Sequence, residues 1–458
     1  MFRKSQKMHF IGIGGIGMSG IAEILINLGY KVSGSDLTES EQTRRLASMG
    51  ARIFIGHDAA NMNEYHVVVT SSAIAPENPE LLEARKRGIP VIHRSEMLSH
   101  LVRMKHGIGV AGTHGKTTIT SMLSYLLWHG GFNPTAVVGG QVLDFKSNAR
   151  VGEGEYIVFE ADESDGSFLK LLPCIGIVSN IDADHLDHYK YFQGLKDAFL
   201  AYINTIPFYG YSVLCADDPT VRELLPLVER PHYTYGLSED ADFRATDIAM
   251  EAGMMRFRCL YKNGPLGVFS LRQLGHHNVV NSLSAIAVAQ ELGMDVETIA
   301  GGLREFRGVH RRLELVGEAG GVSVYDDYGH HPTEIRATLE ALKSLGRRLV
   351  VVFQPHRYSR TRMLCEEFGQ CFAGADVLYL TEIYPAGEQP IEGVSSRLIL
   401  DSLERHEGRG AELIAAFGEI ASTIVPVLRS DDIVLTLGAG DIYKAGTHIL
   451  EEIKRRGS

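Results

Sequence analysis

Residues 107–118 read Gly-Ile-Gly-Val-Ala-Gly-Thr-His-Gly-Lys-Thr-Thr, and this stretch decides the fold of the middle of the chain. An apolar run of strand length ends in a turn bracketed by Gly112 and Gly115, and a helix-like run follows. Such glycines let backbone N–H groups close around a phosphate, while Lys116 can reach the outer phosphates and a threonine hydroxyl can hold Mg²⁺. The full phosphate-loop consensus has glycine where this chain has Val110. The strand–turn–helix context nevertheless predicts a nucleoside triphosphate site.

Composition limits the class of protein. With 458 residues, 45% hydrophobic and 22% charged, the chain is typical of a soluble globular protein of about three domains. A net charge of −11 without a long basic run argues against a nucleic-acid partner. The odd number of cysteines, five, shows no CxxC spacing, which disfavours a disulfide framework and indicates a reducing cytoplasm. No signal peptide or membrane-spanning run is visible, so we expect a cytoplasmic protein without a membrane partner.

Hydrophobic periodicity divides the chain into three α/β segments, 1–106, 107–311 and 312–458. Each segment alternates short buried strands with helices, which is typical of parallel sheets. Residues 231–275 differ, because short strands separated by Gly, Asn and Asp indicate an antiparallel patch. In the third segment we expect a doubly wound unit, with a helix at Leu413–Leu428. The expected strands are His9–Ile13, Val32–Gly34, His66–Thr70, Pro90–Ile92, Gly107–Ala111, Tyr156–Ala161, Ile175–Asn180, Leu349–Phe353, Val377–Thr381 and Ile433–Leu437.

A second glycine-rich turn, Gly12-Ile-Gly14-Gly15-Ile-Gly17, follows the first strand, and Asp36 ends the second. This spacing matches the dinucleotide fingerprint, with a diphosphate on the helix N-terminus and a carboxylate on the ribose. NAD is one interpretation; another diphosphate, or simple packing of helix on sheet, is the alternative. Ser71 and His93 follow the next two strands and should line the same cleft.

Acidic clusters follow two strands of the middle segment. Glu160-Ala-Asp-Glu-Ser-Asp165 comes directly after one strand, and residues 180–188 read Asn-Ile-Asp-Ala-Asp-His-Leu-Asp-His after the next. Crowded carboxylates repel one another unless cations neutralise them, although a solvated acidic turn is the plain alternative. Their place beside the phosphate loop predicts two Mg²⁺ ions, with His185 as an additional ligand. The ligand spacing disfavours zinc.

Polar residues also gather before and within the third segment. Asn278 and Asn281 lie one helical turn apart and could grip a purine or ribose, or Asn278 could cap its helix. Residues 325–333 and 354–360 each follow a strand, so their side chains should face one cleft. Arg357 and Arg360 supply forked donors for a carboxylate or phosphate, which predicts an anion site there.

Taken together, these motifs resemble the Mur ligase superfamily of peptidoglycan synthesis over essentially the whole chain. The shared motifs are GTHGKTT, EADESD, DADHLDHY, HHNVVNSLSA, HRRLE and DDYGHHPTE, in that order. GIGGIGMSGIAEIL, SSAI, HRSEML, QPHRYSRT, LTEIYPAGE and LGAGDIYK are most similar to members that join L-alanine to UDP-N-acetylmuramate. The muropeptide-recycling ligase of the superfamily shares GTHGKTT and HHPT and is the nearest alternative.

The resemblance implies a Rossmann-like UDP-binding domain, a central P-loop-type ATPase domain with Mg²⁺ and a C-terminal Rossmann-like domain that brings the amino acid. It implies that the lactyl carboxylate attacks the γ-phosphate of ATP, and that the alanine amine then attacks the acyl phosphate. Relatives with a carbamoylated lysine place it farther from the DH motif than Lys196 lies from His185, so no carbamate is assigned.

The resemblance also implies site residues. The ATP set is Gly112, Thr113, His114, Gly115, Lys116, Thr117, Thr118, Asn278, Asn281, Arg312 and Asp327. Lys116, Glu160 and His185 would be catalytic, and Thr117, Glu160 and His185 would hold metal. The UDP substrate would meet Gly14, Gly15, Gly17, Asp36, Ser71 and His93. L-Alanine would meet Tyr328, His330, His356, Arg357 and Arg360.

Two other classes remain as alternatives. One is a regulator that binds nucleotide without turnover, which the polar cleft of the third segment disfavours. The other is a dehydrogenase, which the triphosphate loop disfavours, so no NAD is expected. The sequence leaves a homodimer open.

Overall fold

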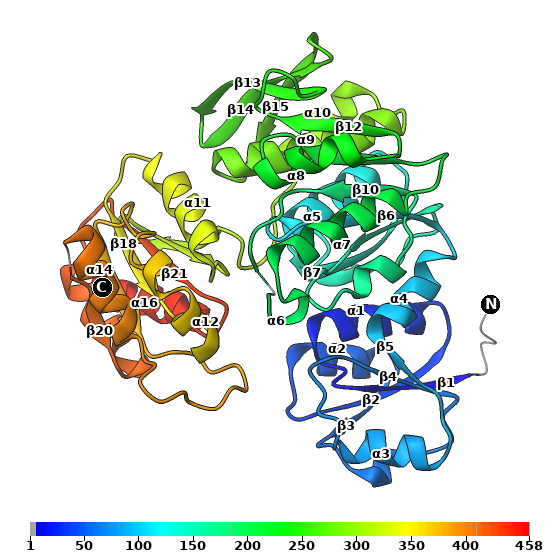
Figure 1. Cartoon of the computed structure of the whole chain (residues 1–458). Helices are drawn as coiled ribbons and strands as arrows, with labels where there is room; N and C mark the ends of the chain where they lie inside the picture. The colour runs from blue at the N-terminus through cyan, green and yellow to red at the C-terminus, as the bar shows by residue number, and fades with distance from the viewer. Residues whose placement is uncertain (1–5, 185, 409, 458) are drawn as a thin grey trace. The chain divides into compact units, whose positions relative to one another are not determined.

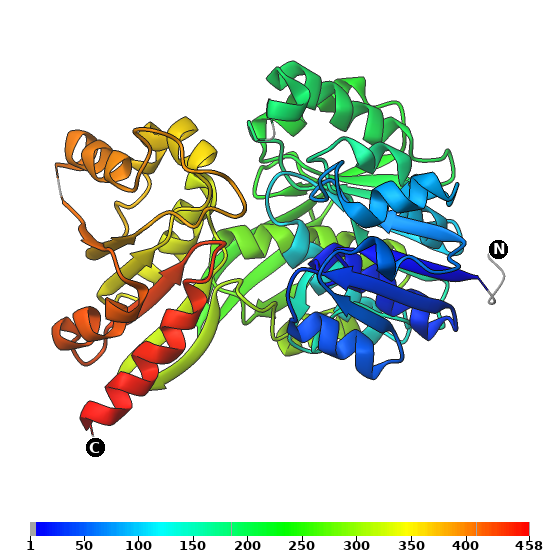
Figure 2. The same cartoon turned by 90° about the horizontal axis from the view of Figure 1, so that it is seen from below.

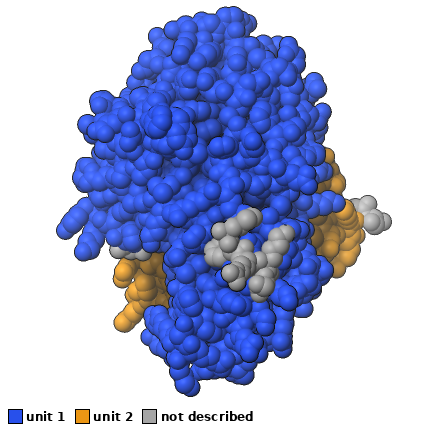
Figure 3. All heavy atoms as spheres, turned by 90° about the vertical axis from the view of Figure 1, so that its right-hand side faces the viewer, with its two compact units in different colours: residues 1–272, 279–309 blue, residues 273–278, 310–458 orange. Residues whose placement is uncertain are grey.

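The computed structural model describes residues 6–184, 186–408 and 410–457, which form two compact units. The first unit comprises residues 1–272 and 279–309, and the second comprises residues 273–278 and 310–458 (Figures 1 and 3). Three β-sheets form among the described residues, two in the first unit and one in the second. This confirms the three-domain α/β class, while the boundaries at 106 and 311 stay predictions.

The N-terminal sheet is parallel, with the order β3-β2-β1-β4-β5. Chain order reverses between β1 and β4, and the carboxyl ends of strands at such a switch point bind ligands in open α/β sheets. The sequence did not predict β3. The elements are β1 (Lys7–Ile11), α1 (Ile16–Asn27), β2 (Lys31–Asp36), α2 (Glu41–Ser48), β3 (Arg52–Ile55), β4 (Val67–Thr70), α3 (Pro79–Lys86), β5 (Val91–His93) and α4 (Arg94–Val102).

The central sheet has ten strands in the order β15-β14-β13-β12-β11-β10-β6-β9-β7-β8. β6 (His106–Ala111) lies between β10 and β9, and its apolar residues Ile108 and Val110 are fully buried. The sequence missed β7, β8 and β11. The other strands are β7 (Thr135–Val142), β8 (Ser147–Arg150), β9 (Tyr156–Glu160), β10 (Ile175–Val178), β11 (Tyr211–Cys215), β12 (His232–Gly236), β13 (Phe243–Glu251), β14 (Met254–Tyr261) and β15 (Gly264–Leu271).

The antiparallel patch is confirmed for β13, β14 and β15. β12 was expected in the same patch, but it pairs parallel with β11 and extends the parallel part of the sheet instead. The helices of this part are α5 (Lys116–His129), α6 (Leu186–Tyr189), α7 (Phe192–Asn204), α8 (Pro219–Leu224), α9 (His276–Glu291) and α10 (Val296–Glu305).

The sheet of the second unit has the order β16-β17-β21-β18-β19-β20 and is parallel except for β16. β18 and β21 are buried along their whole length. Figure 2 shows the C-terminal helix α16, in red, along the β16–β17 hairpin. The strands are β16 (Glu314–Ala319), β17 (Val322–Asp327), β18 (Leu349–Phe353), β19 (Val377–Thr381), β20 (Glu412–Ile414) and β21 (Ile433–Leu437).

The prediction of a helix at Leu413–Leu428 is wrong. β20 occupies its first residues, and only α15 (Ile420–Ile424) is α-helical, between two short 3₁₀ turns. The remaining helices of the second unit are α11 (Pro332–Lys343), α12 (Tyr358–Met363), α13 (Cys365–Phe368), α14 (Arg397–Glu407) and α16 (Tyr443–Gly457). Across the described ranges, no helix combines the length and the apolar content that crossing a bilayer requires.

Candidate active site

The phosphate loop joins the carboxyl end of β6 to the N-terminus of α5, as the sequence predicted. Gly112 and Gly115 have φ angles of +133° and +84°, which side-chain-bearing residues rarely adopt. A Cβ at Gly112 would lie 2.1 Å from the Ser179 hydroxyl oxygen, and one at Gly115 would lie 2.9 Å from Oδ1 of Asn281. Both positions therefore require glycine, and Asn281 lies against the loop.

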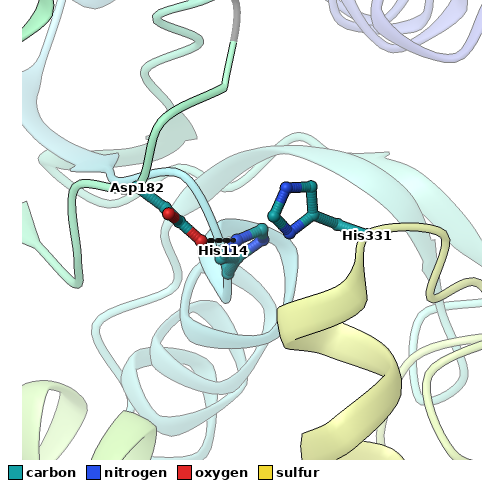
Figure 4. A group of neighbouring side chains, drawn as sticks. All are labelled: His114, Asp182 and His331. Carbon is teal, nitrogen blue, oxygen red and sulfur yellow. Dashed lines mark hydrogen bonds and ion pairs between the residues drawn. The ribbon is translucent and has the colours of Figure 1, made fainter. Parts of the chain in front are cut away.

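The end of β10 fixes the loop from the other side. The Asn180 side chain accepts a hydrogen bond from the His114 backbone N–H at 2.8 Å and donates one to the His114 carbonyl at 3.0 Å. A carboxylate oxygen of Asp182 lies 3.3 Å from Nε2 of His114, and Figure 4 marks this pair with a dashed line. The second acidic segment thus shapes the phosphate loop directly. His331, also drawn in Figure 4, belongs to the second unit, where it is buried at the start of α11.

Lys116 is the partly buried cation of this loop. Its Nζ donates to both carboxylate oxygens of Glu163 at 2.9 Å and to the carbonyls of Gly112 and Thr113 at 2.5 and 3.2 Å. Burial lowers the pKa of Lys116, but the neighbouring carboxylates, Glu163 foremost, outweigh burial and leave the pKa above its ordinary value. The ammonium is therefore charged at neutral pH.

The acidic loop after β9 surrounds this cation. Oε1 of Glu160 accepts from the Gly139 backbone N–H at 2.5 Å, and Asp162 pairs with Arg94 at 2.8 Å. Burial alone would raise the pKa of Asp162, but the charges of Lys116 and Arg94 lower it to about 2. The Tyr189 hydroxyl donates to the Glu163 carbonyl at 2.6 Å and ties the loop to α6. His185, a predicted metal ligand, lies outside the described residues.

The first glycine-rich turn precedes α1, whose N-cap residue, Gly15, has no side chain with which to cap the helix. Exposed N–H groups at a helix N-terminus favour anions. Oδ2 of Asp36 accepts from the Gly14 N–H at 2.8 Å, so this oxygen supports the turn, whereas the fingerprint predicted a carboxylate facing a ribose. Ser71 follows β4, and His93 ends β5 and caps α4.

Rings and cations gather at the strand ends of the second unit. The His330 ring lies 5.5 Å from the Tyr328 ring and 5.8 Å from the His356 ring, which in turn stacks on Tyr384 at 5.7 Å. A guanidinium nitrogen of Arg360 lies 3.3 Å from Nδ1 of His356. Burial lowers the pKa of His330 to about 4 and that of His356 to about 3, so both rings are neutral at pH 7. The sequence correctly predicted that Tyr328, His330, His356 and Arg360 lie close together. It did not assign Tyr384 to the site, although the position of Tyr384 just after a strand could have indicated it.

Arg357 stands beside this cluster in an unusual backbone conformation, φ +73° and ψ 138°. Its N–H donates to the Tyr384 carbonyl at 2.8 Å, and its own carbonyl accepts from Thr361. A non-glycine residue in this region costs on the order of 1–3 kcal/mol, and such strain clusters at ligand sites. The side chain is exposed.

Three of the residues expected to contact ATP make contacts within the protein itself. Asp327 is buried and accepts from the Leu313 and Gly329 backbone N–H groups at 2.7 and 2.8 Å, and burial raises its pKa to about 6. Asn278 lies in the first turn of α9 and donates to the carbonyl of Leu274, which precedes the helix; the capping alternative is wrong because the helix begins at His276. Arg312 lies over the Tyr328 ring.

Two further basic residues, Lys196 and Arg94, bear on the predicted site. Lys196 pairs with Glu223 at 2.5 Å, and that it carries no carbamate stays a prediction. Arg94 belongs to the segment 93–96, which the sequence predicted to line the first cleft without giving Arg94 a role; it pairs with Asp162 of the acidic loop and lies beside Gly17 of the first turn.

Comparisons with protein families and with related proteins agree with the motifs found in the sequence, over nearly the whole chain. The Mur ligase catalytic domain matches residues 7–106, the Mur ligase middle domain residues 110–289, and the Mur ligase glutamate ligase domain residues 311–440. The chain is 53% identical to the UDP-N-acetylmuramate–L-alanine ligases of Geotalea daltonii and Geobacter sulfurreducens, covering 99% of each chain in both cases.

Solved structures give the same result. The UDP-N-acetylmuramate–alanine ligase of Thermotoga maritima superposes with a TM-score of 0.84 at 30% identity, covering 98% of this chain and 99% of that one. A murein peptide ligase of Psychrobacter arcticus shares the fold with a TM-score of 0.73 at 24% identity, covering 98% and 99%. The chain belongs to the Mur ligase family.

Proposed function

We propose that this protein is an ATP-dependent ligase that joins L-alanine to UDP-N-acetylmuramate. The products are UDP-N-acetylmuramoyl-L-alanine, ADP and phosphate, in the synthesis of peptidoglycan precursors. The observation that carries the proposal is the glycine loop with a partly buried, charged Lys116, in a chain whose full-length relatives bear that name. The recycling ligase is the second candidate, because a murein peptide ligase has the same fold.

The reaction proceeds in two transfers. The lactyl carboxylate of the sugar attacks the γ-phosphorus of ATP, and ADP leaves with the bond electrons. The alanine amine then attacks the carbonyl carbon of the acyl phosphate, inorganic phosphate leaves, and the amine loses a proton. Phosphoryl transfer depends on positioned oxygens and concentrated positive charge, which Lys116 supplies at the γ-phosphate.

The donor set beside the loop fits Mg²⁺. Thr117 offers a hydroxyl at the start of α5, and Glu160 offers a carboxylate at the end of β9, and oxygen ligands of this kind suit a hard divalent cation. In our proposal Thr117 holds one ion and Glu160, with His185, holds a second. When bound, the ions neutralise phosphate charge and orient the reacting oxygens.

The remaining residues bind the other substrates. The turn at Gly14, Gly15 and Gly17 takes the UDP diphosphate rather than NAD, with Ser71 and His93 beside it. Neutral His330 and His356, with Tyr328, Arg357 and Arg360, receive the amino acid, whose carboxylate pairs with a guanidinium.

One assay separates the candidate functions. With ATP, Mg²⁺ and UDP-N-acetylmuramate present, phosphate release is measured with L-alanine, glycine, L-serine or L-alanyl-γ-D-glutamyl-meso-diaminopimelate. We expect L-alanine to give the highest kcat/KM. A preference for the tripeptide would identify the recycling ligase, and absence of release with every acceptor would favour a regulator.

Removal of divalent ions tests the metal. Dialysis against EDTA should lower ligation at least about 100-fold, because a metal at phosphoryl oxygens contributes several kcal/mol. Added Mg²⁺ should restore the rate, with ADP formation as the readout. Undiminished turnover in metal-free buffer would contradict the assignment of Thr117 and Glu160.

A further inference from the structure

Arg94 is the first residue of α4 and contacts two functional segments of the first unit. Its Nη2 donates to Oδ2 of Asp162, in the acidic loop, at 2.8 Å. Its Nη1 lies 3.1 Å from the place where a Cβ on Gly17 would stand, beside the first turn of α1. The guanidinium therefore lies between the predicted diphosphate turn and the acidic loop.

The two contacts use different nitrogens of one planar group. Because Nη2 already donates to Asp162, Nη1 can donate to an anion at the α1 turn without breaking that ion pair. Gly17 keeps this approach open, since any larger residue would push into the guanidinium. The side chain is about a quarter exposed, at 24%, so a ligand at the turn can reach it.

The contacts continue from Asp162 to the phosphate loop. Asp162 is followed in the chain by Glu163, and both carboxylate oxygens of Glu163 bind Lys116 at 2.9 Å. An unbroken path of polar contacts and one peptide bond thus leads from the turn at Gly17 through Arg94, Asp162 and Glu163 to Lys116.

We propose that Arg94 couples the two nucleotide sites, so that an anionic nucleotide substrate at the α1 turn tightens binding of ATP at the phosphate loop. A diphosphate on Nη1 restrains the guanidinium, and through Asp162 it holds the acidic loop in the position that orients Lys116. Such coupling is reciprocal, so ATP must tighten the other substrate by the same factor. The identity of the two ligands rests on the proposed function.

The chain offers a matched control in Arg45. This arginine also spans the two sheets of the first unit: it pairs with Glu23 at 2.8 Å and donates to the Lys146 carbonyl at 3.2 Å. Among the described residues, its side-chain hydrogen bonds go to Glu23 and to Lys146, and none goes to the acidic loop. Loss of Arg45 removes a comparable bridge without interrupting the path to Lys116.

Calorimetric titration of the full-length protein measures the coupling. The Kd of a non-hydrolysable ATP analogue with Mg²⁺ is determined with and without saturating UDP-N-acetylmuramate, in wild type, Arg94→Ala, Arg94→Lys, Asp162→Asn and Arg45→Ala. We expect about tenfold tightening in wild type and Arg45→Ala, within the usual range for coupled sites. In Arg94→Ala and Asp162→Asn the factor should fall below about twofold, and Arg94→Lys, which lacks the fork, should fall between.

The possible outcomes distinguish a failure of the proposed coupling through Arg94 from a failure of the proposed ligase function. Wild-type coupling in Arg94→Ala, an equal loss in Arg45→Ala, or no coupling in wild type would each overturn the proposal. If Arg94→Ala does not fold, Arg94→Lys and Asp162→Asn carry the same test. Failure of the proposed function is seen separately, as absence of L-alanine-dependent phosphate release by wild type whatever the binding linkage.

Discussion

Replacing Lys116 with alanine should lower kcat for ligation by about 1,000-fold or more while leaving the Kd for UDP-N-acetylmuramate nearly unchanged. The ammonium is the partly buried cation of the phosphate loop, and removal of a preorganised positive charge from developing phosphoryl charge has effects of this size. Phosphate release and calorimetry measure the two quantities. Ligation at the wild-type rate would show that the loop does not hold the γ-phosphate.

Stability has to be separated from chemistry in this variant. Alanine at position 116 leaves the Glu163 carboxylate, 1% exposed, without its ammonium partner, and an unpaired buried charge costs about 3–5 kcal/mol. The double variant Lys116→Ala/Glu163→Gln removes that charge and should recover thermal stability without recovering turnover. Recovery of turnover by the double variant would contradict the role of Lys116.

Lys105 is the matched control. It is another partly buried lysine of the first unit, and its Nζ donates to the Gly152 and Gly154 carbonyls at 2.6 Å. It precedes β6, whereas Lys116 follows that strand, so the two ammoniums lie at opposite ends of it. Lys105→Ala should lower the melting temperature and leave kcat within about twofold, since lost neutral-acceptor hydrogen bonds affect stability by roughly 1 kcal/mol each.

The local sequence pattern was sufficient to predict the strands that are completely buried. β18 is a continuous and β21 a near-continuous apolar run, both buried on both faces, and β6 is followed by the glycines that its turn requires, so all three were predictable. β7 was missed because its second half, Gly139-Gly140-Gln141, lacks an apolar pattern. The predicted helix at Leu413–Leu428 failed because Pro426 and the strand pairing of β20 with β19 outweigh helical periodicity.

The candidate site was predictable only in part, for a different reason. Strand-end motifs indicated Lys116, Glu160 and the His330–His356 cluster, because strand ends of parallel sheets share an edge. The ion pair of Arg94 with Asp162 joins residues 68 positions apart that follow strands of different sheets, and no local pattern specifies it. Likewise, that Asp36 binds the Gly14 N–H follows from the folded turn and not from the spacing that located it.

Arg357→Ala should raise the KM for L-alanine by about 10- to 100-fold and change the KM for ATP by less than about threefold. A charge-assisted hydrogen bond to the amino-acid carboxylate contributes roughly 1.5–3 kcal/mol, which is lost with the guanidinium. Initial rates with each substrate varied in turn supply both constants. Arg362, exposed on α12, the helix that Arg357 precedes, is the control, and its alanine variant should retain both constants. Equal changes in the two constants for Arg357→Ala would exclude an amino-acid site there.

The strained backbone at Arg357 gives this prediction a second readout. Alanine keeps the cost of φ +73°, whereas glycine adopts that conformation freely, so Arg357→Gly should unfold at a higher temperature than Arg357→Ala by the equivalent of about 1 kcal/mol. Both variants should lose L-alanine binding equally, because both lack the guanidinium. A protein that keeps a strained arginine where glycine would be more stable is expected to do so for the ligand. If glycine restored L-alanine binding, the conformation and not the charge would be what the site requires.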